Sequence, residues 1–333
     1  MKANGREYLS LKDTNVLKGI AVLLLLWHHL FYVQNGLFDD ILLSGDTFLV
    51  NKSGKVCKMC VAIFVFLSGY GLTRQAEVKG GLGKLSIWYR HRYTKLMSNY
   101  WLIWLLFVPV GVFIFGRTLS DAYQNQVAWK LLADVLGMAN AFGFHGYNAT
   151  WWFITCIILL YAIYPLLYKV GKWNVIAILM VGLIGSFLPV KTGASSVHPY
   201  LFPFVFGMVA AIKPIQMGGV KYVALLALPI LIAARIWLGG KVIADSLIAL
   251  SMTYILLSNN IPETVKNTFA FLGKHSMNIF LFHTFIFSHW FKTFIYSPRN
   301  PILIFLLLLT ICVIISLGVE HLKKSINFSK LTS

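Results

Sequence analysis

Long hydrophobic segments recur along the whole chain and are separated by short polar stretches. A transmembrane helix needs about 20 mainly apolar residues, and ten segments are candidates for such helices. They cover residues 15–34, 56–73, 99–116, 151–168, 173–189, 198–212, 220–238, 242–258, 275–296 and 301–319. The pattern predicts an all-α polytopic membrane protein, a bundle of about ten transmembrane helices.

An eleventh apolar segment, 126–142, is interrupted by Lys130 and Asp134. These charges favour an interfacial or re-entrant helix over a transmembrane one. The sequence shows no linker, low-complexity tract or convincing internal repeat. We therefore expect residues 1–333 to form a single integral-membrane domain.

Composition and charge agree with a membrane protein. Hydrophobic residues make up 58% and charged residues 12%, against roughly 25% charged in soluble domains. The net charge of +18 does not indicate nucleic-acid binding, because the basic residues lie in short stretches between apolar segments. Ten spans with both termini in the cytoplasm place 19 of the 29 basic residues on the inner side, nine outside and one within a span. Counting 126–142 as a span would put the basic C-terminal tail outside.

The four cysteines predict no metal site. Cys57 and Cys60 form one CxxC pair, while Cys156 and Cys312 lie in separate apolar segments. A structural zinc site needs a second pair of ligands. We therefore expect isolated thiols within helices and no metal.

The first hydrophobic segment carries the first candidate for chemistry. Lys18 and His29 are eleven residues apart, so at about 100° per residue their directions differ by only about 20°. His29 then lies roughly 16 Å deeper than Lys18, near the middle of the bilayer. A histidine at that depth either serves function or makes an interhelical hydrogen bond. His28 points about 100° away and is better explained by packing.

A second polar face occurs near the end of the chain. Ser276 and His283 are seven residues apart and share one face of the ninth predicted span, which Trp290 continues. Entering from the inside, His283 also reaches the middle depth. Two spans are thus expected to bring an imidazole to a similar level.

A basic segment forms the third feature. The second span ends in FVFLSGYGL (64–72), where Ser68, Gly69 and Gly71 permit close backbone approach. The following segment, 73–98, is expected to be an inner loop with several basic residues, among them Arg90, Arg92 and Lys95. These side chains suit either anionic lipid head groups or a phosphorylated ligand. Taken alone, the lipid interpretation is favoured.

The segment GFHGYNATWW (143–152) is expected on the outer side. Its side chains suit stacking on, and hydrogen bonding to, a sugar, namely His145, Tyr147, Asn148, Trp151 and Trp152. An aromatic belt at the membrane interface explains the same residues, and we favour the belt.

Together these motifs resemble the integral-membrane acyltransferase 3 family over essentially the whole chain. The matching positions are Lys18 to His29 in the first helix, Phe64 to Tyr70 for FFxLSGY, Arg90 and Arg92 for Arg-x-Arg, Trp152, Phe153, Tyr161 and Pro165 for WF…Y…P, and Leu272 to His283 for LGxxSxxIxLxH. The chain departs from the family pattern at five positions, with Asn15 for aspartate, Lys18 for arginine, Ile157 and Ile158 for glutamates, and Ser98 for proline.

The resemblance implies a membrane O-acyltransferase that moves an acyl group, commonly acetyl from acetyl-CoA, to a cell-surface polysaccharide or lipid-linked glycan. It implies a bacterial cytoplasmic membrane and direct transfer without a metal. His29 would be the general base, with an acyl-histidine intermediate as the alternative. Lys18 would position the donor or stabilise negative charge, and His283 and Ser276 would orient acceptor or base. Acyl-CoA would bind at Arg90, Arg92, Lys95 and Ser68.

An exporter of a glycan or lipid-linked intermediate is the alternative. It would also need polar residues at mid-membrane depth and a cavity. An exporter is expected to show an inverted repeat and coupling carboxylates within its spans. Here the acids lie almost entirely in polar stretches, and Asp245 is the main exception.

Overall fold

The computed structural model describes most of the chain. The described residues are 6–7, 9–32, 36–39, 48–188, 197–213, 215–216, 220–237, 242–258, 261–326 and 328. Helices dominate them, and the only strands in this part of the chain are β1 (Arg6–Glu7) and β2 (Ile215–Gln216), which pair antiparallel. The all-α fold class is confirmed. The ends of three predicted spans, at 33–34, 189 and 238, lie outside the described residues, as do both chain termini.

Most predicted spans coincide with apolar helices. Five helices are long and apolar enough to cross a membrane, namely Leu11–Phe31, Leu49–Lys79, Leu85–Phe113, Ala149–Trp173 and Pro301–Ser325. Four shorter apolar helices match four further predictions, namely Val175–Phe187, His198–Ile212, Tyr222–Trp237 and Ile243–Leu256. The ninth predicted span, 275–296, falls on the end of α12 and the helices after it. A total of ten spans and the cytoplasmic termini stay predictions.

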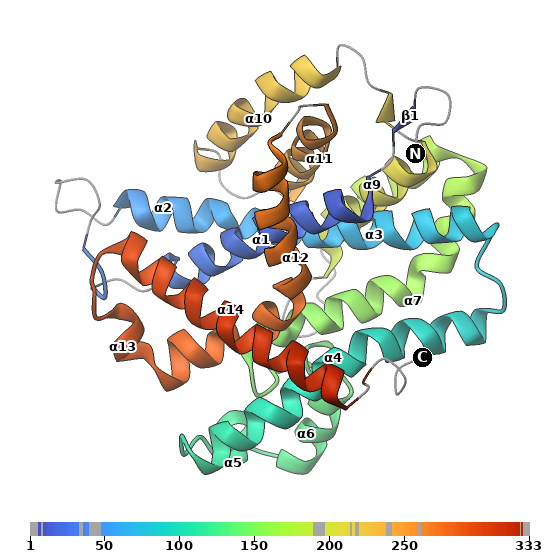
Figure 1. Ribbon diagram of the computed structural model, residues 1–333. Helices are drawn as coiled ribbons and strands as arrows, with labels where there is room; N and C mark the ends of the chain where they lie inside the picture. Colours follow the sequence, from blue (N-terminus) through green and yellow to red (C-terminus); the bar gives the residue numbers. More distant parts are fainter. Residues whose placement is uncertain are drawn as a thin grey trace. The chain divides into compact units, whose positions relative to one another are not determined.

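The chain divides into two compact units. Unit 1 comprises Met1–Gly81, Leu166–Phe187 and Pro199–Ser276, and unit 2 comprises Leu82–Pro165, Leu188–His198 and Met277–Ser333. Unit 1 contains α1 (Leu11–Phe31), α2 (Phe48–Val56), α3 (Cys60–Lys79), α8 (Val175–Phe187), α9 (Leu201–Ile212), α10 (Val220–Trp237) and α11 (Val242–Ser258) (Figure 1). Unit 2 contains α4 (Leu85–Phe113), α5 (Leu119–Tyr123), α6 (Val127–Val135), a π-helix (Phe285–Trp290), α13 (Lys292–Tyr296) and α14 (Pro301–Ser325). Two helices, α7 (Trp152–Trp173) and α12 (Glu263–Thr284), contribute residues to both units.

Glycines bring the backbones of α3 and α9 together in unit 1. A Cβ atom on Gly69 would collide with the carbonyl oxygen of Phe204, and one on Gly207 would collide with the carbonyl oxygen of Phe66. The close approach predicted for Gly69 is therefore confirmed. The same prediction is wrong for Gly71, where an added Cβ would meet open space.

An ion pair joins α10 and α11 within the same unit. The Nε of Arg235 donates a hydrogen bond to Oδ1 of Asp245 over 2.6 Å, and both side chains are buried. Each charge would be costly alone in an apolar environment. Because the two opposite charges compensate each other, α10 and α11 can each carry a buried charged side chain.

In unit 2, α4 is much longer than the predicted third span. It begins at Leu85, directly after a short turn at 80–84 that follows α3. The predicted inner loop 73–98 is therefore wrong, because most of it is helical. Hydropathy marks only the apolar part of a helix, which is the part that lies within the bilayer. The helix itself continues into polar residues, because its backbone hydrogen bonds do not depend on hydrophobic side chains.

Asp134 anchors α6 to the rest of unit 2. Its carboxylate accepts hydrogen bonds from the hydroxyls of Tyr100 and Tyr123, at 2.9 and 2.7 Å, and from the backbone N–H of Tyr147 at 2.8 Å. Burial raises the pKa of Asp134, and these hydrogen bonds oppose that effect. With nine residues, α6 is about 13 Å long and covers less than half of a bilayer core.

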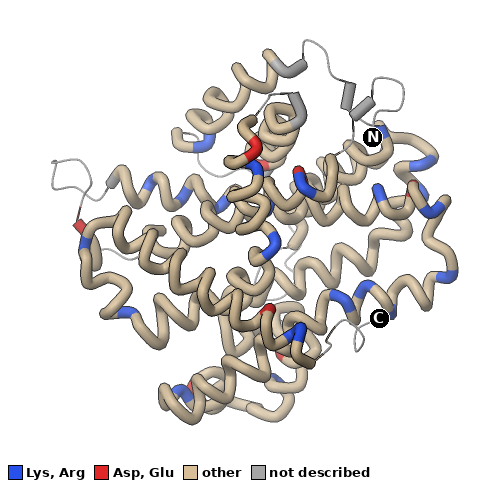
Figure 2. The backbone as a smooth tube through the Cα atoms, viewed as in Figure 1, with Lys and Arg blue, Asp and Glu red and all other residues tan. Residues whose placement is uncertain are grey.

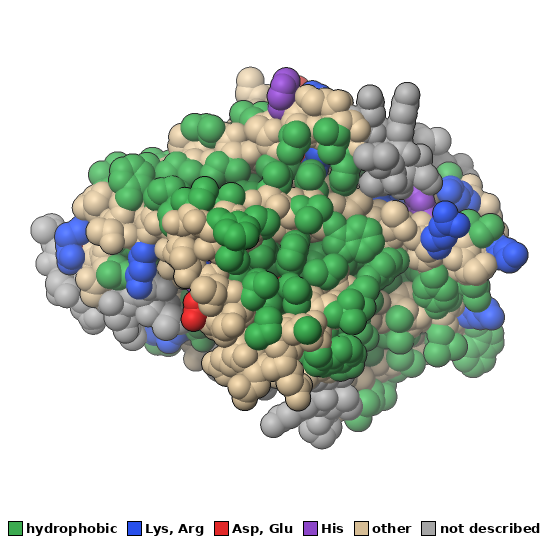
Figure 3. All heavy atoms as spheres, turned by 90° about the horizontal axis from the view of Figure 1, so that it is seen from below, with side chains coloured by type: hydrophobic (Ala, Val, Ile, Leu, Met, Phe, Trp, Pro, Cys, Tyr) green, Lys and Arg blue, Asp and Glu red, His purple; other side chains and the backbone are tan. Residues whose placement is uncertain are grey.

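Large hydrophobic side chains are exposed along several helices. In unit 2 they include Leu105 and Phe113 on α4, the latter 86% exposed, and Leu303 and Ile314 on α14. Figure 3 shows hydrophobic side chains spread across the face that it presents. Apolar surface of this extent marks contact with lipid or another partner, as expected for helices in a bilayer.

Candidate functional site

Lys18 and His29 lie on one unbroken helix, α1, as predicted. This helix begins with a capping box in which the Ser10 and Asp13 side chains bond each other's backbone N–H, the arrangement that satisfies the first amides of a helix. Between Lys18 and His29 the same face carries buried Val22 and Leu25, and the two polar side chains are themselves half-buried. The stripe therefore faces protein. His29 lies in the last turn of α1, and its depth in a bilayer stays a prediction.

The neighbouring histidine has a structural role. The Nδ1 of His28 lies 2.7 Å from the carbonyl oxygen of Gly54, and a carbonyl only accepts, so Nδ1 carries the proton. His28 is buried, and its ring centroid lies 4.9 Å from that of His29. The prediction that His28 is a packing residue is confirmed.

A close contact holds α1 against α12 within unit 1. A Cβ atom on Gly19 would collide with the carbonyl oxygen of Phe269, and one on Gly273 would collide with that of Asn15. Gly19 directly follows Lys18 along α1. The backbone contact thus fixes the part of α1 that presents the lysine.

His283 is held in one tautomer by its own helix. The side chain is 0% exposed, and its Nδ1 lies 3.0 and 2.9 Å from the carbonyl oxygens of Ile279 and Phe280. Since both partners are acceptors, Nδ1 carries the proton and the neutral ring keeps its basic lone pair on Nε2. The π-helix Phe285–Trp290 begins two residues later, and π-helical turns occur frequently at functional sites.

Ser276 shares its helix with His283 and makes a local bond. Its hydroxyl donates to the carbonyl oxygen of Gly273 over 2.8 Å, and the side chain is buried. The proton of the hydroxyl is thereby occupied, which leaves the oxygen lone pairs for a further contact. The seven-residue spacing on one helix is confirmed, while a role in orienting the acceptor stays a prediction.

Arg90 and Arg92 meet in one pocket of unit 2. The pocket has a volume of about 330 Å³ and lies between α4 and α7. It is lined by Tyr89, Arg90, Arg92, Tyr93, Leu96, Ile158, Tyr161 and Ala162. Figure 2 shows basic residues spaced along the N-terminal part of α4. The pocket brings the Arg-x-Arg segment together with Tyr161, which belongs to a motif some 70 residues later in the sequence.

Aromatic contacts hold the N-terminal half of α4 against α7. The Tyr89 hydroxyl donates to the carbonyl oxygen of Ala162 over 2.8 Å, and the rings of Trp88 and Tyr164 stack with centroids 5.3 Å apart. The Arg92 guanidinium lies 5.8 Å from the Trp88 ring, within the range of a cation–π contact. Arg92 is half-buried and Arg90 is exposed. One arginine of the pocket is therefore packed against protein, and the other reaches solvent.

The lining of this pocket carries positive charge and no acid. Ile158 stands where the family commonly has a glutamate, and it lines the pocket as an apolar side chain. The charged residues of the lining are thus Arg90 and Arg92, and guanidinium groups favour an anionic ligand. Lys95 is exposed and does not belong to the lining.

Tyr89 and Tyr93 are lining residues that sequence reasoning missed. They lie on either side of the Arg-x-Arg segment at a spacing of four, so they share a face of α4. The four-residue spacing could have predicted this shared face, but only if the segment were expected to be helical. Because 73–98 was expected to be a loop, the spacing of the two tyrosines carried no structural meaning.

Three of the residues expected to bind a sugar in the outer segment 143–152 are buried. Tyr147 is 0% exposed, and its hydroxyl donates to the carbonyl oxygen of Arg117. The Asn148 amide donates to the Thr284 hydroxyl, and the Trp151 indole donates to the carbonyl oxygen of Leu281. These three side chains are buried and engaged within unit 2, which contradicts both the sugar site and the favoured interfacial belt for them. His145 is exposed and Trp152 is half-buried, and for these two residues both interpretations stay predictions.

The remaining predicted residues are distributed over the two units. Ser68 is half-buried on α3 in unit 1, together with Lys18, His29 and Ser276. Arg90, Arg92, Lys95 and His283 belong to unit 2. The roles assigned to all eight side chains stay predictions. Among the described residues, no group of three or more His, Cys, Asp or Glu side chains is arranged to hold a metal ion.

Comparisons with known proteins identify the family. No curated protein and no solved structure matches the chain. A family model described as an acyltransferase domain, Acyl_transf_3, matches residues 11–321. This match covers nearly the whole chain and includes every motif discussed above. The chain therefore belongs to the acyltransferase 3 family and is a membrane acyltransferase.

Proposed function

We propose that this protein transfers an acyl group, in the first instance acetyl from acetyl-CoA, to a hydroxyl of a cell-surface polysaccharide or lipid-linked glycan, and that it works in the bacterial cytoplasmic membrane. Family membership supports the acyl transfer. The observation that carries the choice of donor is the pocket between α4 and α7, where two arginines line a space with no lining acid.

The donor would bind at this pocket through its phosphates. Guanidinium groups form paired hydrogen bonds with phosphate oxygens, and Arg90 and Arg92 supply two of them. The rings of Tyr89, Tyr93 and Tyr161 add surfaces for the nucleotide. Lys95, exposed on the same helix, would add long-range attraction for the anion, and Ser68 is a further proposed contact for the donor.

In the proposed chemistry His29 acts as general base. Its neutral imidazole takes the proton from the acceptor hydroxyl as the oxygen attacks the thioester carbonyl. The new acyl–oxygen bond forms, the acyl–sulfur bond breaks, and the CoA thiolate takes the proton from the imidazolium. Lys18 would stabilise the negative charge on the carbonyl oxygen during this step. Ser276 and His283 would orient the acceptor.

Removing either arginine of the pocket should weaken donor binding. We expect Arg92→Gln and Arg90→Gln each to raise KM for acetyl-CoA about 10- to 100-fold, the loss typical of a hydrogen bond between charged groups, with little change in kcat. Steady-state kinetics with purified protein measure this. Lys84→Gln, an exposed residue just before α4, is the matched control.

A truncated donor distinguishes phosphate binding from a general effect on the fold. Acetyl-pantetheine lacks the nucleotide phosphates, so wild type and both arginine variants should use it equally poorly. If Arg92→Gln and Arg90→Gln leave KM for acetyl-CoA unchanged, the donor does not bind at this pocket.

The acceptor is tested in cells. Mass spectrometry of envelope glycans, from cells with the protein and cells without it, should show a mass difference of one acyl unit. Restoring the gene for the His29→Ala variant should not bring the acylated mass back. Identical glycan masses in all three strains would refute a glycan acceptor.

A further inference from the structure

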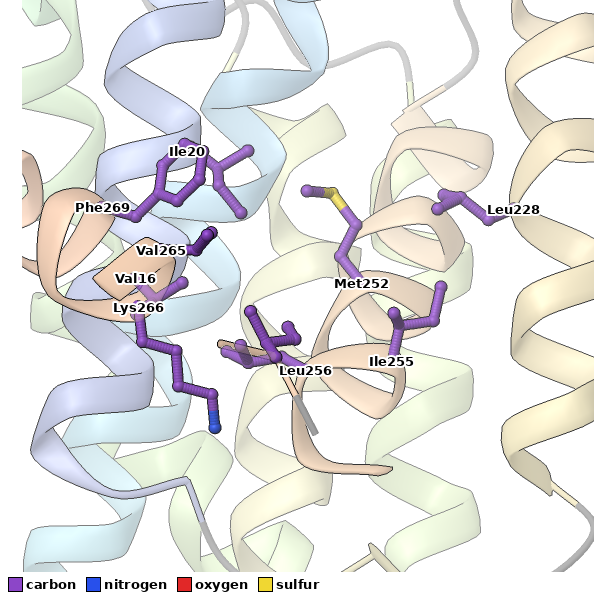
Figure 4. A pocket seen from close by; sticks show the side chains of 10 residues that line it. Val16, Ile20, Leu228, Met252, Ile255, Leu256, Val265, Lys266 and Phe269 are labelled. Carbon is purple, nitrogen blue, oxygen red and sulfur yellow. The ribbon is translucent and has the colours of Figure 1, made fainter. Parts of the chain in front are cut away.

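A second pocket lies in unit 1, away from the arginines. It has a volume of about 160 Å³ and lies among α1, α10, α11 and α12 (Figure 4). It is lined by Val16, Ile20, Leu228, Met252, Ile255, Leu256, Ile261, Val265, Lys266 and Phe269. None of these residues has a role in the proposed chemistry.

The lining is apolar apart from one side chain. Nine of the ten residues are hydrophobic, and Lys266 is the only charged one. Figure 4 shows the Lys266 side chain extending past Leu256, away from Ile20 and Phe269. Apolar side chains of this kind offer few hydrogen bonds to water and favour contact with hydrocarbon. The pocket thus combines a site for hydrocarbon with a cation at one end.

The pocket is open to the surroundings of the protein. Val265 is 41% exposed and Lys266 is half-buried, so a ligand can reach the pocket from the side of α12. The acid nearest to Lys266 in sequence, Glu263, accepts a hydrogen bond from Lys12. Lys12 thus partly offsets the charge of the acid one turn before Lys266.

We propose that this pocket binds an anionic phospholipid of the bilayer, with part of an acyl tail among the apolar side chains and the headgroup phosphate at Lys266. Charge complementarity selects an anionic lipid over a zwitterionic one, because a lysine near the membrane surface attracts negative head groups. Such lipids surround a protein of this kind, since its helices are apolar and it belongs to a membrane family.

The site would connect lipid composition to the helix that carries Lys18 and His29. Phe269 lines the pocket, and its carbonyl oxygen is the atom that Gly19 of α1 approaches. A bound tail fills the space beside this crossing and adds contacts to Val16 and Ile20. The lipid is therefore expected to stabilise the packing of α1 on α12.

Native mass spectrometry of the purified full-length protein tests lipid binding directly. The probes are dioleoylphosphatidylglycerol and dioleoylphosphatidylcholine, titrated separately. We expect tighter binding of phosphatidylglycerol, which Lys266→Gln weakens about fivefold, the effect of one basic residue near anionic lipid. Lys274→Gln, on an exposed residue of α12 that does not line the pocket, should leave binding unchanged. Equal affinity for the two lipids, or unchanged binding in Lys266→Gln, would overturn the proposal.

A second variant tests the hydrocarbon part. Leu228→Trp adds volume to the pocket from α10 and should reduce phosphatidylglycerol binding severalfold, with a lipid-free melting midpoint close to that of wild type. If this folded variant binds as wild type does, the tail does not enter the pocket. Both measurements use no acyl-CoA, so their failure is distinguishable from failure of the proposed acyl transfer.

Discussion

Replacing His29 with alanine is expected to lower the rate of acyl transfer by a factor of about 10² to 10⁴, the usual contribution of a general base. His29 is half-buried and lies on the face of α1 that Lys18, Val22 and Leu25 also occupy, where Val22 and Leu25 are buried. The loss should appear in kcat, because the base acts in the chemical step, while KM for acetyl-CoA changes little. Thioester consumption by purified protein measures both constants.

His321→Ala is the control for a nonspecific effect of removing an imidazole. His321 is exposed near the end of α14 and has no role in the proposed chemistry. It should retain wild-type kinetics. If a folded His29→Ala protein transfers acetyl at the wild-type rate, His29 is not the base, and His283, whose Nε2 keeps its lone pair, becomes the candidate to examine.

Breaking the ion pair between Arg235 and Asp245 should cause the largest loss of stability. Arg235→Met leaves the Asp245 carboxylate buried beside α10 with its 2.6 Å partner removed. Loss of one partner of a buried pair costs about 3 to 5 kcal/mol. The melting midpoint of the purified protein in detergent should fall by many degrees.

The double variant Arg235→Met/Asp245→Leu separates charge from packing. It removes both charges and keeps apolar volume on α10 and α11, and replacing both partners of a buried pair is often neutral. Its melting midpoint should therefore recover to near the wild-type value. A double variant as unstable as Arg235→Met would mean that shape, not the uncompensated charge, determines the loss.

Hydropathy predicts most of the apolar helices of this chain, because the bilayer demands long apolar segments. It failed at α4, where Arg90, Arg92 and Lys95 are helical and not in a loop. Those turns extend beyond the apolar window, so no hydropathy signal marks them. Their helicity shows only in the spacing of Tyr89 and Tyr93, which is meaningful once α7 is known to pack opposite.

Tertiary pairing was beyond the sequence. Arg235 and Asp245 each lie within a predicted span, yet nothing in one sequence indicates that they contact each other. Asp134 looked like an interruption of an apolar segment, whereas it is buried and accepts hydrogen bonds from Tyr100 and Tyr123. Both cases depend on residues from separate helices, and pair contacts carry no periodic signal.

Residue type alone also misled at the outer segment 143–152. The side chains of tyrosine, asparagine and tryptophan are chemically suited to binding sugars, to lying at the membrane interface and to packing in a protein core. Here Tyr147, Asn148 and Trp151 are buried, and their polar atoms bond partners inside unit 2. The solvent exposure of each side chain decides among these roles, and that exposure is known only once the fold is known.

The central claim is that this chain uses acyl-CoA to acylate a hydroxyl. The most direct measurement follows acetyl-CoA labelled in its acetyl group, incubated with the purified protein and an envelope glycan extract. The account predicts that free CoA is released and that the label appears on the glycan as an ester cleaved by mild base. Binding of labelled acetyl-CoA with neither release of CoA nor transfer of label would contradict it.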